Sequence, residues 1–156
     1  MSLPRVLALV GGLGLIAAFF MPWFASQGLL LSGQFLHNFL SGASPAQLRQ
    51  FLPSTSPSEV QALRVLVDLF PVAGAIAVLL SLVAGLAARP PLAVDVLLLL
   101  SGFVPLLAWA IGITRLPGGS MPEIGLYLIA AGAIAVAVGT LLARVVDLRP
   151  SRLSRE

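Results

Sequence analysis

The chain has 156 residues, of which 58% are hydrophobic and only 10% are charged, and its mean hydropathy is +1.03. Soluble domains carry about 25% charged residues, so a core of this size cannot hide so much apolar surface, and we expect a lipid bilayer to cover part of it. The absence of cysteine and the single histidine exclude disulfides and thiolate or multi-histidine metal sites, and the net charge of +3, from nine scattered arginines, does not indicate nucleic-acid binding.

Four apolar segments follow one another along the chain, and each has about the 20 residues that a helix needs to cross the hydrocarbon. They comprise residues 6–24, 69–88, 92–113 and 124–146. The first could be a signal peptide, but Trp23 and Phe24 make a poor cleavage site, so we interpret it as an uncleaved anchor. The sequence therefore predicts an all-α fold, a four-helix transmembrane bundle in a single domain.

The arginines predict how the bundle is oriented. With four spans, both termini and the middle loop share one side, which holds six arginines against three on the other. The six are Arg5, Arg89, Arg144, Arg149, Arg152 and Arg155, and the three are Arg49, Arg64 and Arg115. We therefore expect both termini in the cytoplasm, with the basic tail 147–156 either at the anionic leaflet or disordered. Arginine without lysine, with abundant Ala, Gly, Leu and Pro, suggests a GC-rich bacterial genome and hence the bacterial cytoplasmic membrane.

The long connection at residues 25–63 faces outward in this topology and is rich in leucine and phenylalanine. Connections of this length usually have structure of their own or a function. Ser44 precedes Pro45 and has glutamine three residues later, which predicts a short helix over Pro45–Phe51. Ser32 is placed to cap a second short helix that continues through Leu40. We expect both amphipathic helices to lie at the outer interface or to cover the bundle.

Two capping boxes and two prolines predict the shape of the later helices. The box at residues 56–59 predicts that the second span begins as one long helix near Pro57, and the box at residues 120–123 predicts the start of the fourth span. Pro71 and Pro105 lie inside the second and third spans, where proline removes a backbone hydrogen bond and kinks the helix. A gating hinge at Pro105 is the alternative to a purely structural kink.

Small residues recur on the spans at helical spacing and predict close contact between backbones. The second span carries Ala73, Ala77, Ser81 and Gly85, and the fourth carries Gly125, Gly132 and Gly139. The seven-residue spacing of these glycines favours left-handed antiparallel packing at about 20°. We expect most of these faces to contact other helices of the same chain. Because every span carries such residues, they also predict lateral association, as a homo-oligomer or with other membrane subunits.

Three aromatic residues lie toward the outer ends of the spans. Trp23, Trp109 and Tyr127 predict an aromatic belt at the outer membrane interface. A stacking site for a quinone, lipid or pigment ring is the alternative.

Ionisable residues are absent from the middle of the spans, where they would usually mark a functional site. Asp95 and Glu123 are interpreted as carboxylates at helix N-termini, and Asp68 is expected to pair with Arg64. The midplane hydroxyls of Ser81, Ser101 and Thr140 are expected to bond to carbonyls of their own helices. We therefore predict no catalytic residue, no metal site and no cofactor.

The run Phe20–Met21–Pro22–Trp23–Phe24, followed by Gly28 and Ser32–Gly33, resembles small bacterial four-span membrane proteins with Pro-Trp at the end of the first helix. The topology also resembles the claudin-like tetraspans, although the chain lacks their Gly-Leu-Trp motif and the two cysteines of their first outer loop. The resemblance implies a four-helix bundle and lateral assembly, and it transfers no catalytic residue.

These observations predict a non-enzymatic structural or accessory subunit of a membrane protein assembly, associating through its small-residue helix faces and its apolar outer loop. The alternative is a channel, transporter component or lipid carrier with a cavity near Ser101 and Pro105. A third hypothesis is a membrane enzyme or cofactor-binding subunit that uses an outer polar residue such as His37.

Overall fold

The computed structural model describes the chain except for residues 27, 52–55, 88–89, 115–119 and 149–156. Four long helices dominate the fold, and each is long and apolar enough to cross a membrane. They are α1 (Leu3–Phe20), α4 (Pro57–Leu86), α5 (Leu92–Ile113) and α6 (Ile124–Leu148). The predicted all-α, four-span fold is confirmed, although α1 ends four residues before the predicted boundary because Pro22 and its neighbours form a strand.

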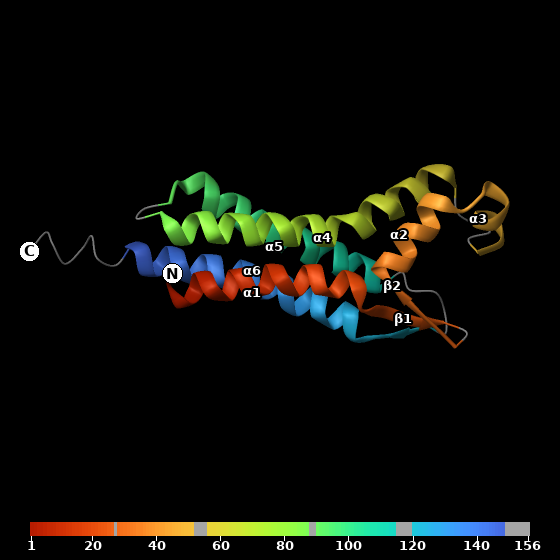
Figure 1. Ribbon diagram of the computed structural model, residues 1–156, viewed down its shortest axis with the longest axis horizontal. Helices are drawn as coiled ribbons and strands as arrows, with labels where there is room; N and C mark the ends of the chain where they lie inside the picture. The colour runs from red at the N-terminus through yellow and green to blue at the C-terminus, as the bar shows by residue number, and fades with distance from the viewer. Residues whose placement is uncertain (27, 52–55, 88–89, 115–119, 149–156) are drawn as a thin grey trace, which may run out of the picture.

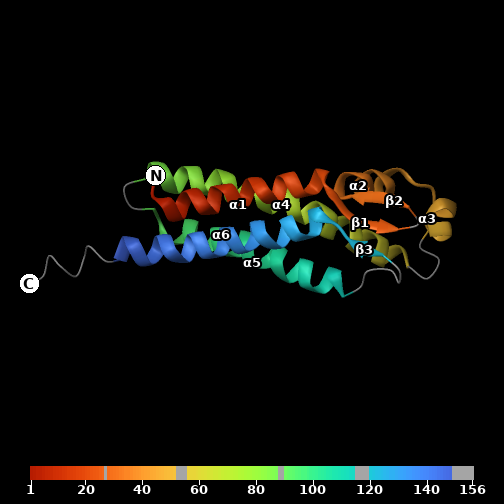
Figure 2. The same cartoon turned by 90° about the horizontal axis from the view of Figure 1, so that it is seen from below.

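The four helices form a closed ring in which each one packs against two others. α1 contacts α4 and α6, and α5 contacts the same two helices from the opposite side. Successive helices run antiparallel, so α1 begins and α6 ends at the same end of the bundle (Figures 1 and 2). All of the shorter elements gather at the other end.

We call these shorter elements the cap, and they include a small sheet that the sequence analysis did not foresee. The strands are β1 (Pro22–Ser26), β2 (Leu29–Ser32) and β3 (Met121–Pro122), paired antiparallel in the order β2-β1-β3. Gly28, between β1 and β2, has a φ of 79°, a left-handed conformation that glycine adopts without strain. The helices of the cap are α2 (Gly33–Gly42) and α3 (Pro45–Phe51).

The core of the bundle is built on direct contact between backbones. A Cβ added at Gly132 of α6 would lie 2.8 Å from the carbonyl oxygen of Gly11 in α1. The same relation holds between Gly12 of α1 and Gly74 of α4, where a Cβ on Gly12 would lie 2.9 Å from the Gly74 carbonyl oxygen. Only glycine allows this approach, and it maximises van der Waals contact, which is the main attraction between helices in lipid.

The small-residue faces predicted from the sequence are covered inside the chain. Ala73, Ala77 and Ser81 of α4 are buried, and Gly85 packs against Met1. Gly125 and Gly139 would each bring an added Cβ to 2.6 Å from a backbone oxygen of the chain's own first segment. These residues hold the bundle together, as we expect for most of them, and lateral association through the same faces stays a prediction.

The two proline-containing helices continue through their prolines. Pro71 lies inside α4, and Figure 1 shows α4 bending as it leaves the bundle toward the cap. Pro105 lies inside α5 and is fully buried.

One of the two predicted capping boxes is present. The Ser56 hydroxyl accepts a hydrogen bond from the amide of Glu59, whose carboxylate accepts one from the Ser56 amide, and α4 begins there. The prediction of a capping box at residues 120–123 is wrong, because Met121 and Pro122 form a strand that pairs with β1. The amide of Glu123 donates to the carbonyl of Trp23 at 2.8 Å, so strand pairing replaces the local cap.

Candidate functional site

Four charged side chains form two ion pairs at the end of the bundle where α1 begins. Arg144 Nη1 donates to Asp95 Oδ2 at 3.0 Å, and Arg5 Nη2 donates to Asp147 Oδ2 at 2.6 Å. In each pair one side chain is buried and the other half-exposed: 6% and 40% exposed for Asp95 and Arg144, 8% and 43% for Arg5 and Asp147. Both half-exposed residues come from α6, which is thereby tied to α5 and to α1.

This ionic end of the bundle has a structural explanation. A buried charge needs a partner, and each buried member has one within hydrogen-bonding distance. Asp95 lies in the first turn of its helix, as predicted, but its ion pair with Arg144 was not predicted. The spacing of Arg144 and Asp147, one helical turn apart, was the available signal that α6 presents both charges on one face.

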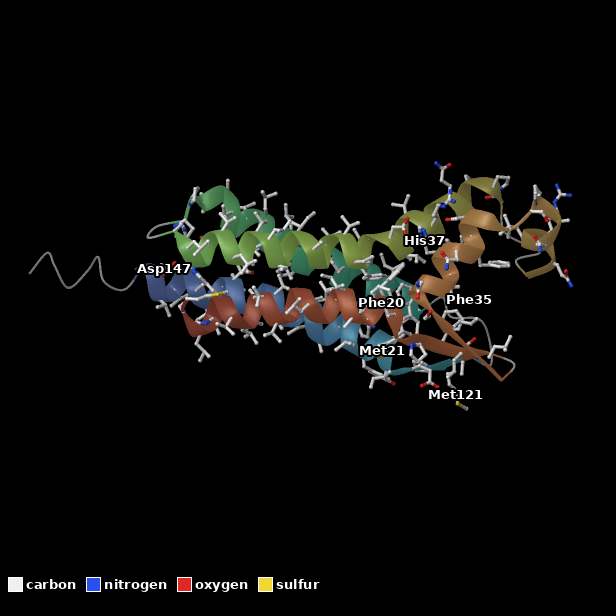
Figure 3. All side chains as sticks on the ribbon, in the orientation of Figure 1. Phe20, Met21, Phe35, His37, Met121 and Asp147 are labelled. Atoms are coloured by element: carbon white, nitrogen blue, oxygen red, sulfur yellow. The ribbon has the colours of Figure 1, made fainter. Side chains whose placement is uncertain are left out.

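A second polar cluster lies at the opposite end, where the cap meets the bundle. His37 Nδ1 of α2 lies 2.6 Å from Asp68 Oδ1 of α4, and Arg64 Nε of α4 donates to Ser41 Oγ of α2 at 3.0 Å. The expected pairing of Asp68 with Arg64 is therefore wrong, since α2 supplies each of them with another partner. Figure 3 shows His37 on the cap side of the bundle, far from Asp147 at the other end of the bundle.

Trp23 anchors the cap to the bundle and is not part of an interfacial belt. The indole is buried, its Nε1 donates to the carbonyl of Ala18 at 2.7 Å, and its ring meets Phe70 edge-on at 5.3 Å. An irregularity in strand pairing between Pro22 and Phe24 falls at this residue. The belt prediction failed here because the chain folds back over the end of α1 and covers the ring.

The other two aromatic residues of the predicted belt are more accessible. Tyr127 on α6 is exposed, while Trp109 on α5 is partly buried against the core. Neither the depth of these rings in a membrane nor their anchoring role follows from their positions, so that part of the belt stays a prediction.

The outward face of the sheet carries an apolar row across all three strands. Leu30 of β2 pairs with Ala25 of β1, which pairs on its other side with Met121 of β3. Leu30 is 63% exposed and Met121 is 70% exposed, and Figure 3 shows Met121 at the edge of the cap. We call Leu30, Ala25 and Met121 the sheet row. Ala25 and Leu30 lie on a part of the chain, residues 6–48, that contains no Asp, Glu, Lys or Arg, and Met121 lies on β3, whose two residues are also uncharged.

The middle of the bundle holds few polar groups, and most of them are satisfied locally. Ser101 donates to the carbonyl of Leu98 at 2.8 Å and Thr140 to that of Val136 at 2.7 Å, as predicted. Ser81 is the exception, because its buried hydroxyl has no hydrogen-bond partner among the described residues.

Near Ser101 and Pro105, where the alternative hypothesis expects a cavity, α5 and α6 are in backbone contact at Gly102. A Cβ on Gly102 of α5 would lie 2.9 Å from both the carbonyl oxygen of Ala133 and the amide nitrogen of Ala137 in α6. The two helices touch there, and Pro105 is fully buried beside the contact. In the part of the chain that the structure describes, no three His, Asp or Glu side chains are grouped to hold a metal ion.

Comparison with known proteins adds no family to these observations: no family model matches the chain, and neither a curated protein nor a solved structure matches it.

Proposed function

We propose that the chain is a non-enzymatic structural or accessory subunit of a membrane protein assembly and that it binds its partner through the sheet row of the cap. The observation that carries this proposal is the exposure of Leu30 and Met121 on a hydrogen-bonded, uncharged sheet outside the helical bundle. Large apolar side chains gathered on one surface outside the lipid mark contact sites, because water solvates them poorly.

The cap is suited to this role because it is fixed in place before any partner arrives. Trp23 holds β1 on the bundle, β3 joins β1 to the start of α6, and His37 holds α2 on α4. A preformed apolar surface loses little conformational entropy on binding, so more of its contact energy appears as affinity. The helical faces toward lipid offer no comparable advantage, because lipid tails solvate leucine as well as another helix does.

The partner that fits this surface is itself apolar and uncharged where it touches the sheet row. A second copy of the chain or another membrane subunit can supply such a surface. We place the cap outside the cell, with both termini in the cytoplasm of a bacterium, because six of the nine arginines fall in the sequence segments that share one side with the two termini of a four-span chain.

Photo-crosslinking in native membranes tests the proposal. A photoreactive residue at Leu30 should give one defined crosslinked product, whereas the same residue at Leu79, an exposed residue in the apolar span of α4, should not. Replacing Leu30 and Met121 together by serine should abolish the assembly in mild detergent, and Gln50→Ser on the exposed surface of α3 should preserve it.

Two outcomes contradict the proposal. One is a wild-type chain that remains monomeric and gives no crosslink from Leu30. The other is an assembly that survives the double serine substitution and crosslinks from Leu79 instead.

A further inference from the structure

We propose that the His37–Asp68 pair is a pH-sensitive clasp that holds α2 against α4 more tightly in acid than in alkali and so regulates the sheet row. The link to partner binding rests on the proposed function, but the clasp itself is a property of the single chain. It uses the one histidine of the sequence.

The pair is close enough to interact strongly and is open to water. His37 Nδ1 lies 2.6 Å from Asp68 Oδ1, and the two side chains are 41% and 39% exposed, so water and protons reach them. Because a carboxylate only accepts hydrogen bonds, the Nδ1 atom carries a proton in this contact. An imidazole that gains a second proton becomes a cation facing an anion, and charge-assisted hydrogen bonds are about twice as strong as neutral ones.

Asp68 is the charged group that lies closest to His37 and would attract its protonated form. Of the elements that pack against α2, α4 presents Asp68 and Arg64, and the Arg64 Nε is directed to Ser41. α1 presents the ring of Phe19, whose centroid lies 6.3 Å from that of His37. The remaining residues of β2 and α2, at positions 29–42, contain no charged side chain. Acidification therefore adds attraction to one contact, between α2 and α4.

The clasp is coupled to the sheet row through Ser32. This residue ends β2 and caps α2, and its Oγ accepts a hydrogen bond from the amide of Phe35 at 3.2 Å. A displacement of α2 from α4 therefore pulls on the strand that carries Leu30. Histidine is the side chain that ordinarily changes charge between about pH 5 and 8, and this range sets the two pH values of the test.

Cysteine accessibility in the purified chain tests the clasp, since the natural sequence contains no cysteine. Leu40→Cys places a reporter at a buried position of α2, and Asn38→Cys on the same helix is exposed and corrects for the thiolate fraction at each pH. The ratio of their alkylation rates should fall about five-fold from about pH 8 to about pH 5.5. In the His37→Gln background the ratio should not change with pH.

A wild-type ratio that is the same at both pH values overturns the clasp, and so does a pH response that survives His37→Gln. If Leu40→Cys disturbs folding, Leu36→Cys gives a second partly buried reporter on the same helix. The measurement needs no partner. A monomeric chain with the expected response therefore contradicts the proposed function alone, and an assembling chain without the response contradicts the clasp alone.

Discussion

At the residue scale, the bundle depends on positions from which a side chain is missing. A Cβ on Gly11 would lie 2.6 Å from the carbonyl oxygen of Gly132, and a Cβ on Gly132 would lie 2.8 Å from that of Gly11. The clashing atoms belong to backbone, which cannot rotate away as a flexible side chain can. An added methyl group must therefore separate α1 from α6 along their shared face.

Gly132→Ala should destabilise the bundle by about 1–3 kcal/mol, the usual effect of overpacking a tight interior. Gly112→Ala is the matched control, because a Cβ at this glycine of α5 meets no atom within 4 Å and alanine favours helix. Unfolding by denaturant in detergent micelles measures both. Equal effects of the two substitutions would show that the contact does not hold the helices.

Trp23→Phe should destabilise the cap by about 1 kcal/mol, because it removes the donor to the Ala18 carbonyl and keeps most of the ring. Trp109→Phe is the control, since the Trp109 Nε1 is buried without a hydrogen-bond partner among the described residues. Protease cleavage within the cap of folded protein should accelerate for Trp23→Phe only. A similar acceleration in both variants would mean that the indole bond has no special role.

At the element scale, α6 is the helix that organises the end of the bundle opposite the cap. It supplies Arg144 to α5 and Asp147 to α1, and each of these residues meets a buried counterpart. The two members of each pair are therefore not equivalent. Removing the half-exposed member leaves a buried charge without a partner. Removing the buried member leaves a charge that water can solvate.

This asymmetry predicts the order of four substitutions. Arg144→Gln and Asp147→Asn should each cost about 3–5 kcal/mol, because they strand Asp95 and Arg5 respectively. Asp95→Asn and Arg5→Gln should cost about 1 kcal/mol or less. Thermal unfolding of the four variants in one detergent gives the ranking, and the reverse order would refute the burial argument.

The sequence was sufficient to predict the long helices because their signal is local. Runs of apolar residues of the right length define α5 and α6, and the Ser56–Glu59 box defines the start of α4. The strands could not be predicted in the same way. β1 pairs with β3, which joins Phe24 to Pro122 across most of the chain, and no local pattern reports such a pairing.

The candidate site was only partly predictable for the same reason. His37 and Asp68 were each visible as polar residues, but their contact depends on how α2 lies against α4. Trp23 was predicted to be an interfacial anchor but is buried, because Gly33 of α2, Phe70 of α4 and Gly125 of α6 pack against its ring. In both cases tertiary contacts between distant segments decided the role of the side chain.

At the scale of the whole molecule, the ring of antiparallel helices separates two chemically different ends. One end carries the ion pairs of α6 with α1 and α5, and the other carries the cap (Figure 1). In the orientation that we propose from the arginine distribution, the ionic end faces the cytoplasm.

Reporter fusions test this orientation directly. Tags after Met1 and after Glu156 should both be protected from an external protease in intact cells, and a tag inserted beside Gly28 in the cap should be cleaved. Opposite accessibility of the two terminal tags would be incompatible with the fold, whereas exposure of both with protection of the cap would reverse only the orientation.

The first and last helices are linked at both ends of the bundle, by an ion pair at one end and by strand pairing at the other, and this has a consequence for biosynthesis. Arg5 pairs with Asp147, which lies 142 residues later in the chain, and β1 pairs with the distant strand β3, so both partners are synthesised long after the first segment. The first helix therefore enters the membrane long before the last helix has been translated. A nascent chain arrested before α6 would leave the glycine face of α1 without its partner, so the ring can close only after α6 has been made.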